Sequence, residues 1–153
     1  MPEGQRAPKQ IKVKSLDDYL EIMSKVVFQS GMSWKIIENK WPDIRSAMDN
    51  FDIRKVADYD ERDIERLTQD RRVIRNYRKL VAIPSNARKI LQLDKEHGSF
   101  RKYLASHTNF DAAVKTIRKD FKFMGPMGTY YFLHVVGEKV PPHEKFQADY
   151  QRK

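Results

Sequence analysis

The sequence contains no cysteine among its 153 residues, and this absence removes several kinds of chemistry. Disulfide bonds, cysteine nucleophiles and thiolate-ligated zinc are all excluded. The sequence also lacks an apolar run long enough to span a bilayer, which takes about 20 residues. No basic stretch followed by an apolar one opens the chain, so a secretory signal is not expected. These absences favour a cytoplasmic protein with no membrane partner.

Alternation of apolar and polar side chains with a period of two is also missing, whereas helical spacing recurs along the chain. The sequence therefore predicts an all-α fold. Its length suits one domain with a sizeable core. We expect residues 15–153 to form a single helical domain. Residues 1–14 are basic, contain proline and glycine and lack periodicity, so they are expected to form a flexible arm.

Capping and breaking residues predict where the helices begin and end. Ser15 and Asp18 match a capping box, and Gly31 is expected to end the helix that follows. Pro42 is typical of the first turn of a new helix. Residues 73–93 are expected to form one long helix or two abutting ones, with Pro84 kinking or restarting the helix. Asp52 and Asp60 are expected to be N-caps, and a polar tail is expected from residue 140. Shorter helices are expected at residues 33–37, 53–59, 61–69, 100–104, 113–117 and 130–136.

The formal net charge of +9 and the isoelectric point near 9.7 favour an anionic partner. Much of the positive charge is concentrated between residues 71 and 93, where seven basic residues occur and no acidic one. These are Arg71, Arg72, Arg75, Arg78, Lys79, Arg88 and Lys89. We expect them to make one face positive and to contact phosphates in a salt-dependent manner. A basic surface without a function is the alternative.

The segment 28–34 reads Phe-Gln-Ser-Gly-Met-Ser-Trp and is predicted to join two helices. Gly31 ends the first helix and Ser33 begins the second, so Trp34 lies one residue into the new helix. Such a turn can hold a large aromatic ring at the lip of a cleft. We predict that Trp34 stacks on a nucleobase, whereas Trp41 is expected to pack in the core or a groove.

The segment 121–129 is a candidate helix–hairpin–helix motif. Gly125 would let a phosphate approach the backbone, and the N–H groups of the next helix, which starts near Pro126, would point at it. An ordinary packing corner between two helices is the alternative, and the basic run favours DNA. The residues predicted to bind DNA are Lys119, Lys122, Phe123, Met124, Gly125, Pro126, Met127, Gly128 and Thr129.

Three blocks, taken in order and at matching spacing, resemble the bacterial 3-methyladenine DNA glycosylase I family, a branch of the helix–hairpin–helix DNA glycosylases. The first block is 29–34, and the third is 121–125. The second runs from 51–57 through 73–79 to 86–88. The likeness spans about residues 20–137. It implies a helix–hairpin–helix glycosylase-like helical bundle.

The resemblance also implies base excision repair, in which a damaged base is flipped out of duplex DNA, stacked between aromatic rings and cut from its sugar by water. The expected substrate is an alkylated purine, first of all 3-methyladenine. Trp34 matches the family's base-stacking tryptophan, and Gln29, Ser33, Phe28 and Val26 are expected in the same pocket. A monomer acting at the bacterial nucleoid is expected.

The chain departs from the family pattern at two places. Family members carry zinc held by cysteines and histidines near the two termini, and with no cysteine this chain is expected to bind no metal or other cofactor. The family's pocket glutamate lies eight residues before the tryptophan, where this chain has Val26. Two alternatives therefore stay open: a non-catalytic DNA-binding module and a glycosylase for a different base lesion.

Glu144 is the candidate catalytic acid, because it lies nineteen residues after Gly125, near where related glycosylases place a catalytic aspartate. It would stabilise the developing sugar cation or activate water. A solvated acid in a polar tail is the alternative. His143 is read as a surface histidine rather than a general base, and Glu38 as a surface partner of a nearby lysine.

Catalysis could also rest on base binding and water positioning alone, because an N-alkylated purine is a cationic leaving group that needs little protonation. Glycosylases that also act as lyases use a lysine amine just after the hairpin as nucleophile. Gly128 and Thr129 occupy that neighbourhood here, so a monofunctional hydrolase is expected.

Overall fold

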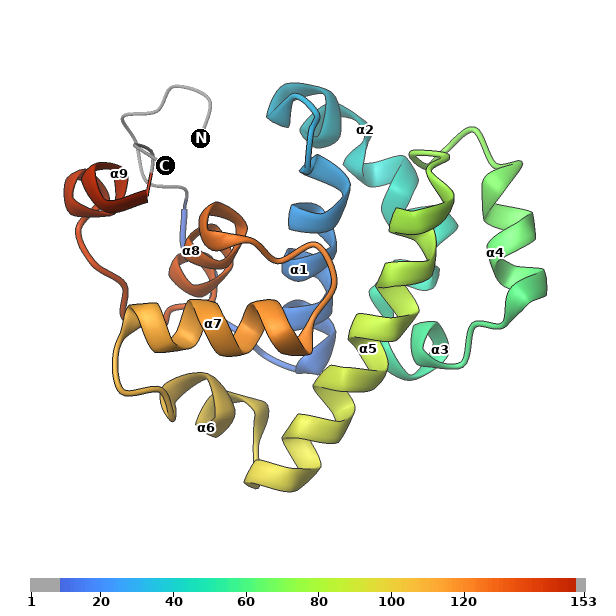
Figure 1. Ribbon diagram of the computed structural model, residues 1–153. Coiled ribbons are helices and arrows are strands. Elements are labelled where there is room, and N and C mark those ends of the chain that lie inside the picture. The colour runs from blue at the N-terminus through green and yellow to red at the C-terminus, as the bar shows by residue number, and fades with distance from the viewer. Residues whose placement is uncertain (1–8, 151–153) are drawn as a thin grey trace.

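The computed structural model describes residues 9–150; residues 1–8, which make up much of the predicted N-terminal arm, and 151–153 lie outside the described range. Within it the chain forms nine α-helices, one short 3-10 helix and no strand, which confirms the all-α prediction (Figure 1). The elements are α1 (Leu16–Gln29), α2 (Trp34–Ala47), η1 (Asp49–Phe51), α3 (Ile53–Ala57), α4 (Glu61–Thr68), α5 (Tyr77–His97), α6 (Phe100–Ala105), α7 (Phe110–Asp120), α8 (Pro126–Val135) and α9 (His143–Tyr150). None of these helices combines the length and the apolar character that a bilayer crossing requires.

The long helix α5 connects the two parts of the fold. Figure 1 shows α2, α3 and α4 on one side of α1 and α5, and α6 to α9 on the other. Helix α5 packs against α1, α3, α4 and α6. Its side chains Leu80, Ile83, Ala87 and Ile90 lie at helical spacing and are fully buried. Burying each large apolar side chain contributes about 1.5–3 kcal/mol, so this stripe fixes the position of α5 in the core.

Two prolines lie inside helices: a new helix was expected at Pro42, and at Pro84 either one long helix or two abutting ones. Helix α2 runs through Pro42, so the two short helices predicted on either side of it are one, and α5 runs through Pro84. A proline removes one backbone hydrogen bond from a helix interior. Trp41 and Ile44 are buried on either side of Pro42, and Pro84 is itself buried. Tertiary packing therefore offsets the local loss.

Two of the four predicted N-caps make side-chain cap bonds; Ser33 stands at the N-cap of α2 but its side chain makes none. The side chains of Asp52 and Asp60 accept hydrogen bonds from the first backbone amides of α3 and α4, as predicted. The capping box at Ser15 was wrong, because the Ser15 side chain makes no cap bond and Asp18 accepts instead from the Lys14 N–H at 2.8 Å. Helix α5 starts later than expected because Asn76 caps it through the Lys79 N–H.

Both ends of the described chain pack against α8. The Ile11 N–H donates to the Val135 carbonyl at 2.8 Å, and the Gln10 side chain donates to the His134 carbonyl. The expected polar tail is in fact helix α9. Its Phe146 is buried and stacks on Tyr130 with ring centroids 4.1 Å apart, which holds α9 to α8.

Candidate functional site

The turn between α1 and α2 is built by a glycine in the left-handed conformation. Gly31 has a φ of 75°, a value that L side chains rarely adopt. The Met32 N–H closes the turn on the Gln29 carbonyl at 2.7 Å, and the Gln29 side chain donates to the Met32 carbonyl at 3.2 Å. Trp34 is thereby the first residue of α2, and its ring is only half-buried.

A cleft of about 630 Å³ separates this turn from the start of α8. Trp34 lies on one side, with its ring 4.3 Å from that of Tyr131 and inclined by 36°. The cleft brings together residues from α1, the turn, the hairpin, α8 and α9. They are Val26, Gln29, Ser30, Gly31, Met32, Ser33, Trp34, Phe123, Gly125, Pro126, Met127, Gly128, Tyr130, Tyr131, His143 and Phe146. Four of the predicted base-pocket residues, Trp34, Gln29, Ser33 and Val26, thus share one space with the hairpin.

Val26 forms an apolar wall of the cleft against the backbone of Gly128. Val26 is buried, and a Cβ atom added at Gly128 would lie 2.5 Å from its Cγ1 atom. Real Cβ atoms do not approach other atoms so closely. Only glycine at position 128 therefore allows α1 and α8 to come this close.

The hairpin has the geometry that the sequence predicted. Gly125 is the N-cap of α8, Pro126 is its first residue, and the Thr129 N–H donates to the Gly125 carbonyl at 2.8 Å. The amides of Met127 and Gly128 belong to the first helical turn, where the helix offers no acceptor, so they are suited to an anion.

The nine residues predicted to bind DNA differ in how far their side chains are exposed. Lys119, Lys122 and Met127 are exposed, whereas the side chains of Met124 and Thr129 are buried in the protein interior. A contact with DNA at these two predicted positions would therefore come from the backbone and not from the side chain. Their apolar groups fix the hairpin from inside.

Phe28 does not line the cleft, and its assignment to the base pocket is corrected. Its side chain is fully buried and meets Trp41 edge-on, with centroids 6.2 Å apart. Two residues along a helix turn the side chain by about 200°, so Phe28 and Val26 face opposite sides of α1. Trp41 stacks on Phe51 at 5.2 Å, which confirms its predicted packing role.

The acidic candidates lie outside the cleft. Glu144 is exposed in the first turn of α9, and the described residues that line the cleft include no carboxylate. Glu38 pairs with Lys25 at 3.2 Å rather than with the neighbouring lysines that we expected. His143, expected at the surface, is half-buried and lines the cleft beside Tyr130.

Tyr131 was missed by the sequence analysis. It follows another tyrosine, and helical spacing alone does not show which of two adjacent tyrosines meets Trp34. Burial and then the nearby Glu38 charge raise the pKa of Tyr131 to about 12, so its phenol stays protonated at neutral pH.

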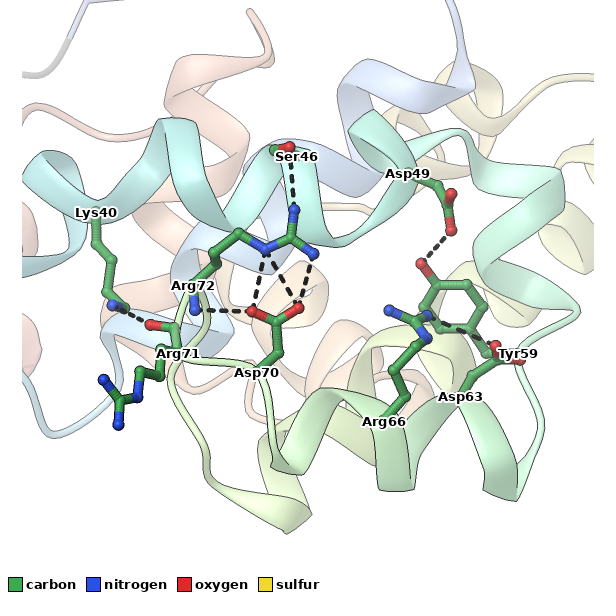
Figure 2. Close-up of polar contacts among 9 residues, drawn as sticks. All are labelled: Lys40, Ser46, Asp49, Tyr59, Asp63, Arg66, Asp70, Arg71 and Arg72. Atoms are coloured by element: carbon green, nitrogen blue, oxygen red, sulfur yellow. Dashed lines mark hydrogen bonds and ion pairs between the residues drawn. The ribbon is translucent and has the colours of Figure 1, made fainter.

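The basic run does not form one uniform positive face, which corrects that prediction. Figure 2 shows Arg72 held by the Asp70 carboxylate and Ser46, and Lys40 donating to the Arg71 carbonyl. Arg88 donates to the Ala57 carbonyl at 2.9 Å. Lys79 is only 5% exposed. Part of this charge thus serves the fold rather than a ligand.

No group of three or more histidines and acids that could hold a metal ion occurs within residues 9–150. With no cysteine in the chain either, the residues present do not fit the zinc site that the family resemblance implies.

Comparisons with known proteins agree on one family. A sequence model described as methyladenine glycosylase matches residues 12–120. DNA-3-methyladenine glycosylase 1 of Escherichia coli K12 is 32% identical over 130 residues, which cover 71% of this chain and 70% of that protein. DNA-3-methyladenine glycosylase of Haemophilus influenzae Rd is 26% identical over the same shares of both chains. A crystal structure of 3-methyladenine DNA glycosylase I superposes with a TM-score of 0.72 at 28% identity, covering 83% of this chain and 81% of the other.

Proposed function

The chain belongs to the methyladenine glycosylase family, and we propose that it is a DNA repair enzyme that removes alkylated purine bases by hydrolysing their N-glycosidic bond. The relatives act on 3-methyladenine by name, and we assign 3-methyladenine in duplex DNA as the first substrate. One observation carries the proposal: Trp34 and the hairpin residues Gly125 to Gly128 line the same cleft. A base in that cleft would lie next to a phosphate on the hairpin.

The hairpin is the proposed binding site for a DNA phosphate. Free amides at the N-terminus of α8 favour a negative group, and Lys119 and Lys122 add positive charge beside it. Because such contacts release counterions from DNA, affinity for undamaged duplex should fall steeply with salt. This contribution does not depend on which base is damaged.

The cleft is the proposed base pocket. The flipped base would stack on Trp34, with Gln29 and Ser33 at its polar edge and Val26 as an apolar wall. Stacking of a base on an aromatic ring contributes about 1–3 kcal/mol. Water then attacks the sugar C1′ atom, the C1′–N bond breaks, and its electron pair goes to the purine. The cationic alkylated purine thereby leaves as a neutral base, and the proton lost by water goes to solvent.

We further assign a monofunctional, cofactor-free monomer that acts on DNA in the bacterial cytoplasm, at the nucleoid and without a membrane partner. Residues 15–153 would form its single domain, whereas the expected flexible arm is corrected for the described residues 9–14, because Gln10 and Ile11 bond to α8. The side chains of Gly128 and Thr129 carry no amine that could attack the sugar, as a lyase would require.

The experiment is to incubate the protein with methylated duplex DNA and to identify the released bases by chromatography. Release of 3-methyladenine is the expected result. The second candidate is a non-catalytic DNA-binding module, which the apolar Val26 wall favours. Salt-sensitive duplex binding without any released base would support that module and contradict the enzyme. Release of another modified base instead would reassign the lesion.

A further inference from the structure

Two buried polar side chains on α5 lie behind the cleft without lining it. Lys79 and Asn86 are 5% and 1% exposed, respectively. Burial of a cation or an amide is costly unless hydrogen bonds replace the lost water. The partners of these two side chains show what their burial achieves.

Lys79 holds the turn that carries Trp34. Its Nζ atom donates to the carbonyls of Phe28, at 2.8 Å, and Ser30, at 2.5 Å. These carbonyls lie at the C-terminal end of α1, where the helix dipole is negative and a cation is favoured. Since Ser30 and the residues that follow it line the cleft, Lys79 fixes one wall from behind.

Asn86 holds the hairpin in the same way. Its Nδ2 atom donates to the Lys122 carbonyl at 3.2 Å, and its Oδ1 atom accepts from the Lys122 N–H at 2.9 Å. The next residue, Phe123, has a φ of 62°, which is unusual for a side chain other than glycine. Phe123 lines the cleft, so Asn86 secures a strained part of the opposite wall.

Lys79 and Asn86 are seven residues apart, so they share one face of α5 and are separated by about 10 Å along its axis. One rigid face therefore holds two walls that are far apart in the sequence. We propose that Lys79 and Asn86 are positioning residues that set the separation of the Trp34 turn and the hairpin. The inference rests on the proposed function, because this separation aligns a flipped base with the phosphate that the hairpin holds.

Excision depends on this alignment, whereas binding of undamaged duplex depends on the hairpin amides and the exposed lysines. Lys79→Met keeps most of the apolar stem and removes the cation, and Asn86→Leu keeps the size and removes both hydrogen bonds. Each should lower the single-turnover excision rate about 10- to 100-fold, as small misplacements do. Lys79→Met should change duplex affinity by less than about twofold, because the hairpin keeps its hydrogen bonds to Asn86. Lys79→Gln, which can still donate to the carbonyls, should recover part of the rate.

Lys95→Met is the matched control, because Lys95 is exposed on the same helix. Its excision rate should equal that of the unaltered protein. Denaturation curves give the folded fraction of each variant, and rates are compared per folded molecule. A loss that disappears after this correction would show a purely structural role and overturn the proposal. If Lys79→Met does not fold, the excision rates of Lys79→Gln and Asn86→Leu per folded molecule test the proposal instead.

Trp34 fluorescence provides a readout that needs no activity. In a Trp41→Phe background Trp34 is the only tryptophan. Its emission should shift to longer wavelength in the Lys79 and Asn86 variants, because the ring loses its contacts in the cleft. If the unaltered protein releases no base, the proposed function fails while this measurement still tests the positioning role. Unchanged emission in folded variants of both residues would overturn the inference.

Discussion

The ring of Trp34 lies against the ring of Tyr131, with centroids 4.3 Å apart and planes inclined by 36°. One ring comes from the first residue of α2 and the other from the middle of α8. Because α8 also begins with the hairpin glycine, this contact joins the base-stacking candidate to the phosphate-binding candidate. The pair thus links stacking of the flipped base to binding of the phosphate, and a base-flipping enzyme combines both.

Replacing Trp34 by alanine should remove most excision activity and leave DNA binding largely intact. Loss of base stacking, about 1–3 kcal/mol, corresponds to a roughly 5- to 150-fold lower single-turnover rate. Excision assays on methylated duplex and binding assays on undamaged duplex check this. Trp41→Phe, which alters a buried ring that stacks on Phe51, is the control and should keep its activity. Equal losses of excision and binding in Trp34→Ala would refute a base-stacking role.

Replacing Gly128 by alanine should destabilise the protein, because the new methyl group would lie 2.5 Å from the Val26 Cγ1 atom. Overpacking of this kind costs about 1–3 kcal/mol, measured as a lower free energy of unfolding in urea. Gly125→Ala is the matched control, since nothing lies within 4 Å of its added Cβ atom. The double variant Val26→Ala/Gly128→Ala should lose less stability than the sum of its single changes. Strict additivity would contradict the proposed contact.

Features that depend on neighbouring residues were predictable from the sequence. Asp52 and Asp60 cap their helices as expected, because a cap needs only the next three residues. The sequence left open whether residues 73–93 form one helix or two, since the continuation of α5 through Pro84 depends on packing with distant segments. The same limit applies to the cleft: Trp34 was identified from its own turn, but the partner ring of Tyr131 lies almost a hundred residues away.

Acid should weaken the link between Asp70 and Arg72. Hydrogen bonds from the Arg72 side chain lower the pKa of Asp70 to about 2, below its ordinary value of 3.8. A carboxyl group with a lowered pKa contributes stability above the unfolded value, and this contribution is lost as pH falls through the folded value. The free energy of unfolding should therefore drop more between pH 4 and pH 2 in the unaltered protein than in Asp70→Asn. Parallel pH profiles of the two proteins in urea would contradict this.

Replacing Glu144 by glutamine should leave excision within about twofold of the unaltered protein, because a catalytic group must reach the reacting atoms. Glu144 is exposed in the first turn of α9 and does not line the cleft, whereas its neighbour His143 does. His143→Gln should consequently have the larger effect on the single-turnover rate. Both rates are measured on the same methylated duplex, with enzyme in excess. A tenfold or greater loss in Glu144→Gln alone would mean that α9 moves when DNA binds and brings this carboxylate to the sugar.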